Sequence, residues 1–393
     1  MHDTLVINCG SSSLKFALIR LSSQETLLSG LAEKLFEAEP VLTVKSAAGK
    51  QVVKLSEQGH AEAMRGILGV LQEQDLLSQV SSVGHRVVHG GEFFKSATRI
   101  DAAVVQAIRD CIPLAPLHNP ANLLGIEEAM KAFPDLPHVA IFDTAFHQTM
   151  PEQAYRYALP DNLYQEHGVR RYGFHGTSHQ YVTQQAAKLL GKPLEDTCLV
   201  SAHLGNGCSI TAVKGGQSVD TSMGMTPLEG LVMGTRSGDL DPNIHLFLSQ
   251  TLGWTLEQVT NVLNKKSGLL GISGLSNDCR ELEEAKNQGH AGATLALEVF
   301  CYRLAKYVAA MAVPLGRVDA LIFTGGIGEN SRFVREKTLS HLGILGFHLD
   351  PEKNAGMVGG QSGPITREGG PVALVVGTNE ERMIALQTRE VLS

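Results

Sequence analysis

Residues 5–16 read Leu-Val-Ile-Asn-Cys-Gly-Ser-Ser-Ser-Leu-Lys-Phe, an apolar run, a turn of small residues and a return to apolar residues. A further apolar run at 26–31 predicts a third strand, so the chain opens as a β-meander. The same order recurs from residue 198, with runs at 198–200 and 209–213, glycine turns between them, and a third strand expected at 217–220. A strand–glycine–strand pattern is common by itself, but two copies of a meander indicate two related domains.

Three short, fully apolar runs predict buried central strands at 139–142, 320–323 and 372–376. Each is followed by polar residues, and ligands of open α/β sheets bind beyond the carboxyl ends of the strands. Helical patterns are expected at 60–77, from Thr177 or Ser178 to Leu190, at 255–263, at 291–313, and at the C-terminus.

Composition excludes several classes of protein. The 393 residues include 41 Gly without a three-residue period, and 43% are hydrophobic, which excludes collagen and a disordered chain. A net charge of −7 without a basic run argues against nucleic-acid binding. No long apolar stretch predicts a membrane span, and the first residues do not resemble a signal peptide. We therefore expect a cytoplasmic protein whose six cysteines are reduced and mostly buried.

Three glycine turns are candidates for phosphate binding: 10–13, 205–207 and 325–328. Glycine lets the backbone approach an anion closely, although none of these turns is a P-loop and each alone is more typical of an ordinary tight turn. Because all three follow predicted strands, and two of them occupy the same place in the repeated meander, together they indicate one nucleotide held between two domains.

Two arginines stand beside glycines, Arg86 in the segment 84–91 and Arg236 in the segment 234–238. The guanidinium fork suits carboxylate and phosphoryl oxygens, and a structural salt bridge is the alternative for each. His175 and His179 have a zinc-like spacing, but Gly176 interrupts the expected helix and no third ligand is evident, so a hydrogen-bonding histidine is favoured.

Carboxylates at strand ends are the candidate magnesium ligands: Asp143, Glu329, Glu380 and Glu381. Asp239 and Asp241 form a competing pair, for which a turn-and-cap role before a helix starting at Pro242 is favoured.

These segments resemble, in the same order and over nearly the whole chain, the signatures of the acetokinase family. They lie at 5–16, 85–91, 142–147, 172–179, 203–207, 278–280, 324–330 and 378–381. The resemblance implies an α/β protein with two ribonuclease-H-like domains of a duplicated actin-like fold around a central cleft. The expected domains are 1–150 with the C-terminal helix 379–393, and a nucleotide-binding domain at 151–378. It also implies a homodimer.

The activity implied is reversible transfer of a phosphoryl group from ATP to acetate, giving acetyl phosphate and ADP, with Mg²⁺ as cofactor and Mn²⁺ as a substitute. By matching motifs, the catalytic residues are Asp143, His175, Arg236 and Arg86, and the metal site contains Asn8 and Glu380. The acetate pocket is formed by Arg86, Val88, Leu117, Phe174 and Pro227. ATP is held by Lys15, His203, Leu204, Gly205, Asn206, Gly207, Asp278, Cys279, Arg280, Gly326, Ile327, Gly328, Glu329 and Asn330.

The residue types fit this chemistry, because an acetate-like carboxylate has a pKa near 4 and is already an ionised nucleophile at neutral pH. Direct in-line transfer then needs positioning and charge neutralisation rather than a general base. Branched Val88 is expected to shorten the pocket and favour acetate, with a propionate kinase of the same family as the alternative. An actin-fold ATPase or chaperone without an acyl acceptor is a further alternative, in which Arg86 and Arg236 have no purpose.

Overall fold

The computed structural model describes residues 3–393, which divide into two compact units. Unit 1 comprises the described residues up to Gln148 together with Asn379–Ser393, and unit 2 comprises Thr149–Thr378. The chain thus leaves unit 1 once and returns to it for the C-terminal helix.

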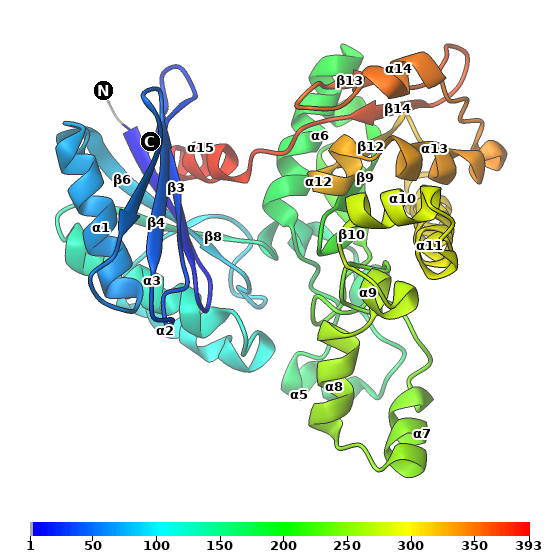
Figure 1. The fold of residues 1–393 in the computed structure, drawn as a ribbon, viewed down its shortest axis with the longest axis horizontal. Helices are drawn as coiled ribbons and strands as arrows, with labels where there is room; N and C mark the ends of the chain where they lie inside the picture. Colours follow the sequence, from blue (N-terminus) through cyan, green and yellow to red (C-terminus); the bar gives the residue numbers. More distant parts are fainter. Residues whose placement is uncertain (1–2) are drawn as a thin grey trace. The chain divides into compact units, whose positions relative to one another are not determined.

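Unit 1 is built on an eight-stranded sheet in the order β5-β4-β3-β2-β1-β6-β8-β7 (Figure 1). β1 pairs antiparallel with β2 and parallel with β6, and β6 pairs parallel with β8. Because β1, β6 and β8 are parallel neighbours, their carboxyl ends share one edge of the sheet. The strands are β1 Asp3–Cys9, β2 Leu14–Arg20, β3 Glu25–Glu33, β4 Val41–Ser46, β5 Gly49–Lys54, β6 Val80–Val87, β7 Thr98–Arg99 and β8 His138–Phe142.

Helices cover both faces of this sheet, and the alternation of side chains along β1 shows how. Leu5 and Ile7 pack in a core that contains residues of α1 (His60–Glu73) and α3 (Asn119–Ala132). Val6 points the opposite way and packs with Ile384 of α15 (Glu380–Leu392). α15 lies directly on β6, because a Cβ at Gly84 would stand 2.5 Å from Thr388 Oγ1. The unit also contains α2 (Ala102–Asp110).

Unit 2 is built on a six-stranded sheet in the order β11-β10-β9-β12-β14-β13. β12 pairs parallel with both β9 and β14, and every residue of β12 is buried. Figure 1 shows α6 (Gly176–Leu190) on one side of these strands and α11 (Ala291–Leu315) on the other. The strands are β9 Cys198–Leu204, β10 Cys208–Lys214, β11 Gln217–Thr221, β12 Ala320–Thr324, β13 Gly363–Pro364 and β14 Val372–Val375.

Shorter elements complete the two units. The remaining α-helices are α4 Glu152–Tyr155, α5 Asp161–His167, α7 Asn243–Leu252, α8 Leu256–Lys265, α9 Gly268–Ser273, α10 Cys279–Asn287, α12 Gly325–Asn330, α13 Arg332–Ser340 and α14 Pro351–Gly356. The 3₁₀ turns are η1 Leu77–Gln79, η2 Ile112–Leu114, η3 Ala145–Thr149, η4 Leu194–Asp196 and η5 Gly343–Leu345.

Every strand expected from the two meanders and the three apolar runs is confirmed, and the antiparallel order β1-β2-β3 of unit 1 is repeated as β9-β10-β11 in unit 2. The buried state of the six cysteines is also confirmed, and none forms a disulfide. Burial raises the pKa of Cys9 and of Cys301 to about 12, which keeps these thiols protonated. Within residues 3–393, no helix is both long and apolar enough to cross a membrane.

Two helix predictions and one turn prediction were wrong in detail. The helix at 60–77 ends at Glu73, and Leu77 belongs to a separate 3₁₀ turn. α6 begins at Gly176, so neither Thr177 nor Ser178 caps it; the residue before it is His175, held at φ +57° in the left-handed region. The segment 325–328 is the start of helix α12 rather than a free turn, and Gly325 at φ +75° makes the sharp change of direction after β12.

Candidate functional site

The carboxyl edge of the unit 1 sheet brings together three of the predicted residues. Asn8 lies on β1, Arg86 on β6, and Asp143 directly follows β8. The Arg86 guanidinium donates from Nε to Asp143 Oδ1 at 3.1 Å and from Nη2 to Oδ2 at 2.6 Å. A third bond runs from Arg86 Nη1 to Asn8 Oδ1 at 3.3 Å. Asn8 and Asp143 therefore hold Arg86 in one orientation.

Burial and charge act in opposite directions on this pair. Asp143 is 1% exposed, and its burial raises the pKa of the carboxyl group even though Arg86 pulls the pKa down. Burial opposes the charged form of Arg86, but the negative charges of Asp143 and Glu380 outweigh burial and raise the pKa of the guanidinium. Arg86 thus remains a cation, and its charge is partly compensated before any substrate binds.

Helix α15 brings two more carboxylates to the same region. It begins at Glu380. The preceding residue, Asn379, is the N-cap, and its side chain accepts the N–H of Arg382. The Glu380 charge acts on both Arg86 and Asp143. Glu381 forms an ion pair with Lys15 on β2. Glu380 is therefore the carboxylate of α15 that stays available for a cation, whereas Glu381 is engaged by Lys15.

In each of the two repeated turns, the N–H of the first glycine donates to a carbonyl later in the same turn. The Gly10 N–H donates to the Ser13 carbonyl at 2.8 Å, and the Gly205 N–H donates to the Gly207 carbonyl at 3.0 Å. These two N–H groups donate within their own turns and cannot donate to a phosphate. In the first turn, the exposed residues are Ser11 and Ser12.

In unit 2, three histidines lie at the start of α6 and the end of β9, where hydroxyls of Ser178 on α6 and Ser209 on β10 bond them. Ser209 Oγ lies 2.9 Å from His175 Nδ1 and 2.8 Å from His179 Nε2. Since a hydroxyl has one proton to donate, the roles of the two rings at Ser209 are coupled. Ser178 Oγ lies 2.8 Å from His203 Nδ1, and the rings of His203 and His175 lie 4.3 Å apart. This network orients His175.

His175 and Arg236, two predicted catalytic residues, border the turn at Gly207. A Cβ placed at Gly207 would lie 3.5 Å from His175 Cε1 and 3.4 Å from Arg236 Nη1. Arg236 Nη1 donates to the Pro227 carbonyl at 3.0 Å, and no carboxylate among residues 3–393 forms an ion pair with Arg236. Burial lowers the pKa of Arg236. Its cation is therefore left without a protein counter-charge, as expected of a group kept for an anion.

A cavity of about 700 Å³ lies on unit 2 and contains residues from three of the predicted ATP segments. That volume is in the range of small-ligand sites. The predicted residues lining it are Gly205, Asn206, Asp278, Cys279, Arg280, Gly326, Ile327 and Asn330. Asn277, Glu283 and Ser331 also line it and were not predicted. The only sequence signal for them was their position beside segments already singled out.

The predicted ATP ligands of unit 2 that do not line this cavity are His203, Leu204, Gly207, Gly328 and Glu329. The Glu329 carboxylate accepts the N–H groups of Gly325 at 3.0 Å and Thr378 at 3.1 Å, so it holds the beginning of α12 and the end of unit 2. These bonds engage Oε1 of Glu329. Buried Arg335 fixes the other end of α12 by donating to the carbonyls of Gly328 and Glu329.

The four apolar residues expected at the acetate methyl group differ in exposure. In unit 1, Val88 is buried and its N–H donates to Asn122 Oδ1, whereas Leu117 is 69% exposed. In unit 2, Phe174 is buried and Pro227 is partly buried beside Arg236.

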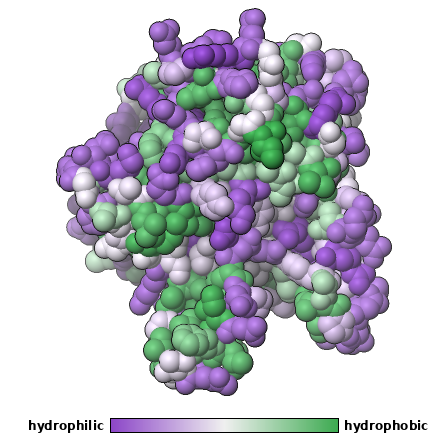
Figure 2. Space-filling view, turned by 90° about the vertical axis from the view of Figure 1, so that its right-hand side faces the viewer, coloured by the Kyte–Doolittle hydropathy of each residue, from purple (hydrophilic) through white to green (hydrophobic). Residues whose placement is uncertain are grey.

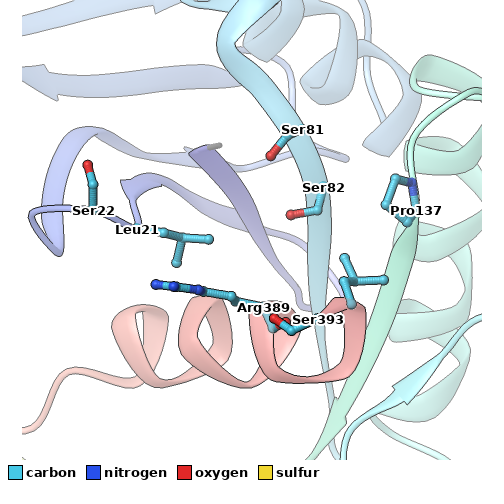
Figure 3. Close-up of a pocket in the computed structure, with 8 residues that line it drawn as sticks. Leu21, Ser22, Ser81, Ser82, Pro137, Arg389 and Ser393 are labelled. Carbon is cyan, nitrogen blue, oxygen red and sulfur yellow. The ribbon is translucent and has the colours of Figure 1, made fainter. Parts of the chain in front are cut away.

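A second cavity, of about 480 Å³, lies on unit 1 at the amino ends of the parallel strands and holds none of the predicted site residues. Figure 3 shows Ser81 and Ser82 of β6 facing it, with Arg389 and Ser393 from the end of α15 opposite them and Leu21 beside them. It lies at the sheet edge opposite to Arg86.

Comparison with known proteins finds likeness over the full length. The model of the acetokinase family matches residues 3–386. The acetate kinase of Ectopseudomonas mendocina (strain ymp) is 61% identical over 391 residues, covering 100% of this chain and 99% of the relative. The acetate kinase of Deinococcus deserti is 59% identical over 391 residues, covering 99% of this chain and 98% of the relative.

Solved structures are similar over the whole chain as well. The propionate kinase of Francisella tularensis superposes with a TM-score of 0.95 at 46% identity, and the acetate kinase of Porphyromonas gingivalis with a TM-score of 0.95 at 44% identity. Each covers 100% of both chains. The two units therefore have the duplicated actin-like α/β fold that the repeated meander indicated.

Proposed function

We infer that this chain, which belongs to the acetokinase family, transfers a phosphoryl group reversibly between ATP and acetate, giving ADP and acetyl phosphate. The observation that carries the inference is the likeness to acetate kinases at 59–61% identity over essentially the full length of both chains. The substrate is a carboxylate that is already ionised at neutral pH, so the enzyme needs no base to activate it.

We propose direct in-line attack of the acetate oxygen on the γ-phosphorus of ATP. A P–O bond forms to acetate while the bond to the ADP oxygen breaks, and the electron pair leaves with ADP. The catalytic demand is to position the two anions and to neutralise the charge on the transferring group.

In unit 1, we propose that Arg86 binds oxygens of the acetate or the phosphoryl group. Asn8 and Asp143 support this role because they hold the Arg86 guanidinium in place by accepting three hydrogen bonds from it. Asp143 acts through Arg86, since both of its carboxylate oxygens are already engaged there.

In unit 2, we propose that Arg236 and His175 stabilise negative charge on the transferring phosphoryl group. Their common position beside Gly207, and the lack of a carboxylate partner for Arg236, support that role. The 700 Å³ cavity next to this turn is the proposed nucleotide site, and Lys15 is a proposed further ATP contact from unit 1.

The donors in unit 1 fit a magnesium ion, and we propose that Asn8 and Glu380 hold it. Magnesium takes oxygen ligands, uses one or two carboxylates, and completes its shell with water and phosphate oxygens. Among residues 3–393, no cluster of three or more His, Cys, Asp or Glu side chains forms a metal site, so the protein would supply only part of the shell. When bound, Mg²⁺ or a substituting Mn²⁺ would neutralise phosphate charge.

The test is a coupled assay that measures kcat/KM for acetate, propionate and butyrate with ATP and Mg²⁺. We expect acetate to be the best substrate, with propionate roughly 10-fold or more weaker, because one methylene in a tight pocket is worth about 1–3 kcal/mol. A higher kcat/KM for propionate would favour the activity named for the Francisella protein. Free phosphate without acyl phosphate trapped by hydroxylamine would instead indicate an ATPase.

We further propose that the protein is a cytoplasmic homodimer that uses α7 in its interface. No residue of this helix is buried, and it exposes Leu246 by 55%, Phe247 by 62% and Leu252 by 53%. Figure 2 shows apolar side chains at the lower end of its view, the level at which Figure 1 places α7 and α8. Large exposed apolar patches are typical of protein interfaces. Phe247→Glu should therefore shift the mass measured by sedimentation from dimer to monomer, and an unchanged mass would exclude α7.

A further inference from the structure

Arg236 stands in a loop, 230–239, whose two ends meet at a narrow neck. Gly230 and Asp239 form this neck by two hydrogen bonds: the Gly230 N–H donates to Asp239 Oδ1 at 2.7 Å, and the Asp239 N–H donates to the Gly230 carbonyl at 3.0 Å. One of the two bonds needs the carboxylate side chain. The side chain of Asp239 therefore closes the loop that presents Arg236.

The second carboxylate oxygen joins the neck to the long helix behind it. Asp239 Oδ2 accepts the hydroxyl of Tyr307 at 2.5 Å, and Arg303 Nη1 donates to the Asp239 carbonyl at 3.3 Å. Both partners belong to α11, which packs against β9, β10 and β11. Burial and the neighbouring Asp239 charge raise the pKa of Tyr307, so its hydroxyl keeps the proton that it donates.

The backbone path at the neck is restricted, because Gly238 and Gly230 have positive φ and lie close to other backbone atoms. Gly238 has φ +67°, and a Cβ there would lie 2.3 Å from the Leu231 carbonyl oxygen. Gly230 has φ +109°, and a Cβ there would lie 2.7 Å from the Ser222 carbonyl oxygen. Inside the loop, the Met233 N–H donates to the Arg236 carbonyl at 3.2 Å. The backbone of Arg236 is thereby bonded to Met233 within the loop that the neck closes.

We propose that Asp239 is a positioning residue for Arg236: it closes the neck of the loop 230–239 against α11 and so sets where the Arg236 guanidinium stands. This role rests on the proposed function of Arg236 in phosphoryl transfer. It assigns to Asp239 neither a metal nor a helix cap. The expected turn role belongs to Asp241, whose Oδ1 accepts the Asn243 N–H at 2.9 Å. The helix itself begins at Asn243 rather than at Pro242, and its N-cap is Pro242.

The experiment measures kcat and KM for both substrates in Asp239→Ala, Asp239→Asn, Arg236→Ala and the double variant Asp239→Ala/Arg236→Ala. Asp239→Ala should lower kcat about 10- to 100-fold, with the KM for ATP within about 2-fold of the parent, since a misplaced catalytic group costs up to about 100-fold. Asp239→Asn keeps an oxygen acceptor for the Gly230 N–H and should restore activity to within about 5-fold of the parent enzyme.

Asp241→Ala is the matched control, because it removes the same charge two positions away and leaves the neck intact. It should keep kcat within about 2-fold of the parent. The double variant should be no slower than Arg236→Ala alone, because a residue that acts only through Arg236 has nothing left to position.

Two results would overturn the proposal while leaving the function of Arg236 intact: parent-like kcat in Asp239→Ala, or a double variant whose loss equals the product of the two single losses. Parent-like kcat in Arg236→Ala would instead refute the proposed function of Arg236. The two failures are thus distinguished within one set of proteins.

Discussion

Arg86 and Arg236 carry the same charge in opposite surroundings. Arg86 spends Nε and Nη2 on Asp143 and Nη1 on Asn8, and the carboxylates near it raise the pKa of its guanidinium against the effect of burial. Arg236 has the carbonyl of Pro227 as its oxygen partner, and burial lowers its pKa. One cation is compensated by the protein and the other is not.

This difference separates two ways of preparing an arginine for an anion. Arg86 is held rigidly, but the negative charge of its partner reduces the positive potential that it presents. The Asp143–Arg86 pair also gives each charge a partner, and either charge buried alone would cost much free energy. Arg236 keeps its full charge, and its loop rather than a counter-ion determines its position. We expect the two residues to matter equally for turnover but very differently for stability.

The largest expected effect is on turnover. Arg236→Ala and Arg86→Ala should each lower kcat by about 1,000-fold or more, because an arginine that stabilises the transferring phosphoryl group is worth about 10³–10⁵ in rate. Steady-state assays in both directions measure the loss, and circular dichroism checks that each variant is folded. Turnover within 10-fold of the parent in either variant would remove that arginine from the reaction.

A second effect concerns stability and separates the two arginines. Arg86→Met leaves the buried Asp143 carboxylate without a counter-charge and should cost on the order of 3–5 kcal/mol. Burial then holds the Asp143 pKa above its unfolded value, so the loss should grow as pH rises from 5 to 8. Arg236→Met removes an unpaired, partly buried charge and should leave the free energy of unfolding unchanged or higher.

Peptide-level hydrogen exchange can measure the change in unfolding free energy in each unit separately. The fluorescence of Trp254 reports on unit 2, in which that residue lies. The double variant Arg86→Met/Asp143→Asn is the control, since it removes the stranded charge and should recover much of the stability. Equal losses in Arg86→Met and Arg236→Met would contradict the contrast drawn above.

The smallest expected effect comes from the residue beside Arg86 on β6. His85 Nε2 lies 2.9 Å from His138 Nδ1 on β8, and burial together with the neighbouring ring holds the pKa of His85 well below 6.5. The unfolded chain therefore binds more protons, and unit 1 should lose stability as pH falls below about 6.5. The slope should be at most about 1.4 kcal/mol per pH unit for each proton.

Hydrogen exchange of β6 and β8 between pH 7.5 and 5.5 gives this slope. His85→Gln should flatten it, and an identical slope in that variant would assign the acid sensitivity to another group.

Much of the fold could be read from local patterns. Period-two and fully apolar runs are short-range signals, so the strands of both meanders and the central strands were predicted at nearly their observed positions. The helix ends were less accurate. His175 occupies a left-handed conformation before α6 because its ring is held by Ser209 and His203, and no rule of capping by Thr177 or Ser178 contains that information.

The lining of the cavity proposed for the nucleotide was predicted only in part, for a related reason. Glycine and asparagine at strand ends marked Gly205, Asn206 and Gly326. Glu283 on α10 and Ser331 at the start of α13 line the cavity because these two helices pack beside it. Neither residue belongs to a glycine turn or stands at a strand end, so the only signal for them was closeness in the sequence to the segments 278–280 and 324–330.

By itself, the sequence determined the duplicated α/β architecture, the strand ends at which we expect the chemistry, and the family to which the chain belongs. These depend on residue order and on motifs that are contiguous in the chain. Only the tertiary structure decided that Asp143 compensates Arg86, that Arg236 is left uncompensated, and that Asp239 closes the loop holding it. Burial and hydrogen bonds between distant segments set those differences, because the electrostatic environment of a side chain is a property of everything packed around it.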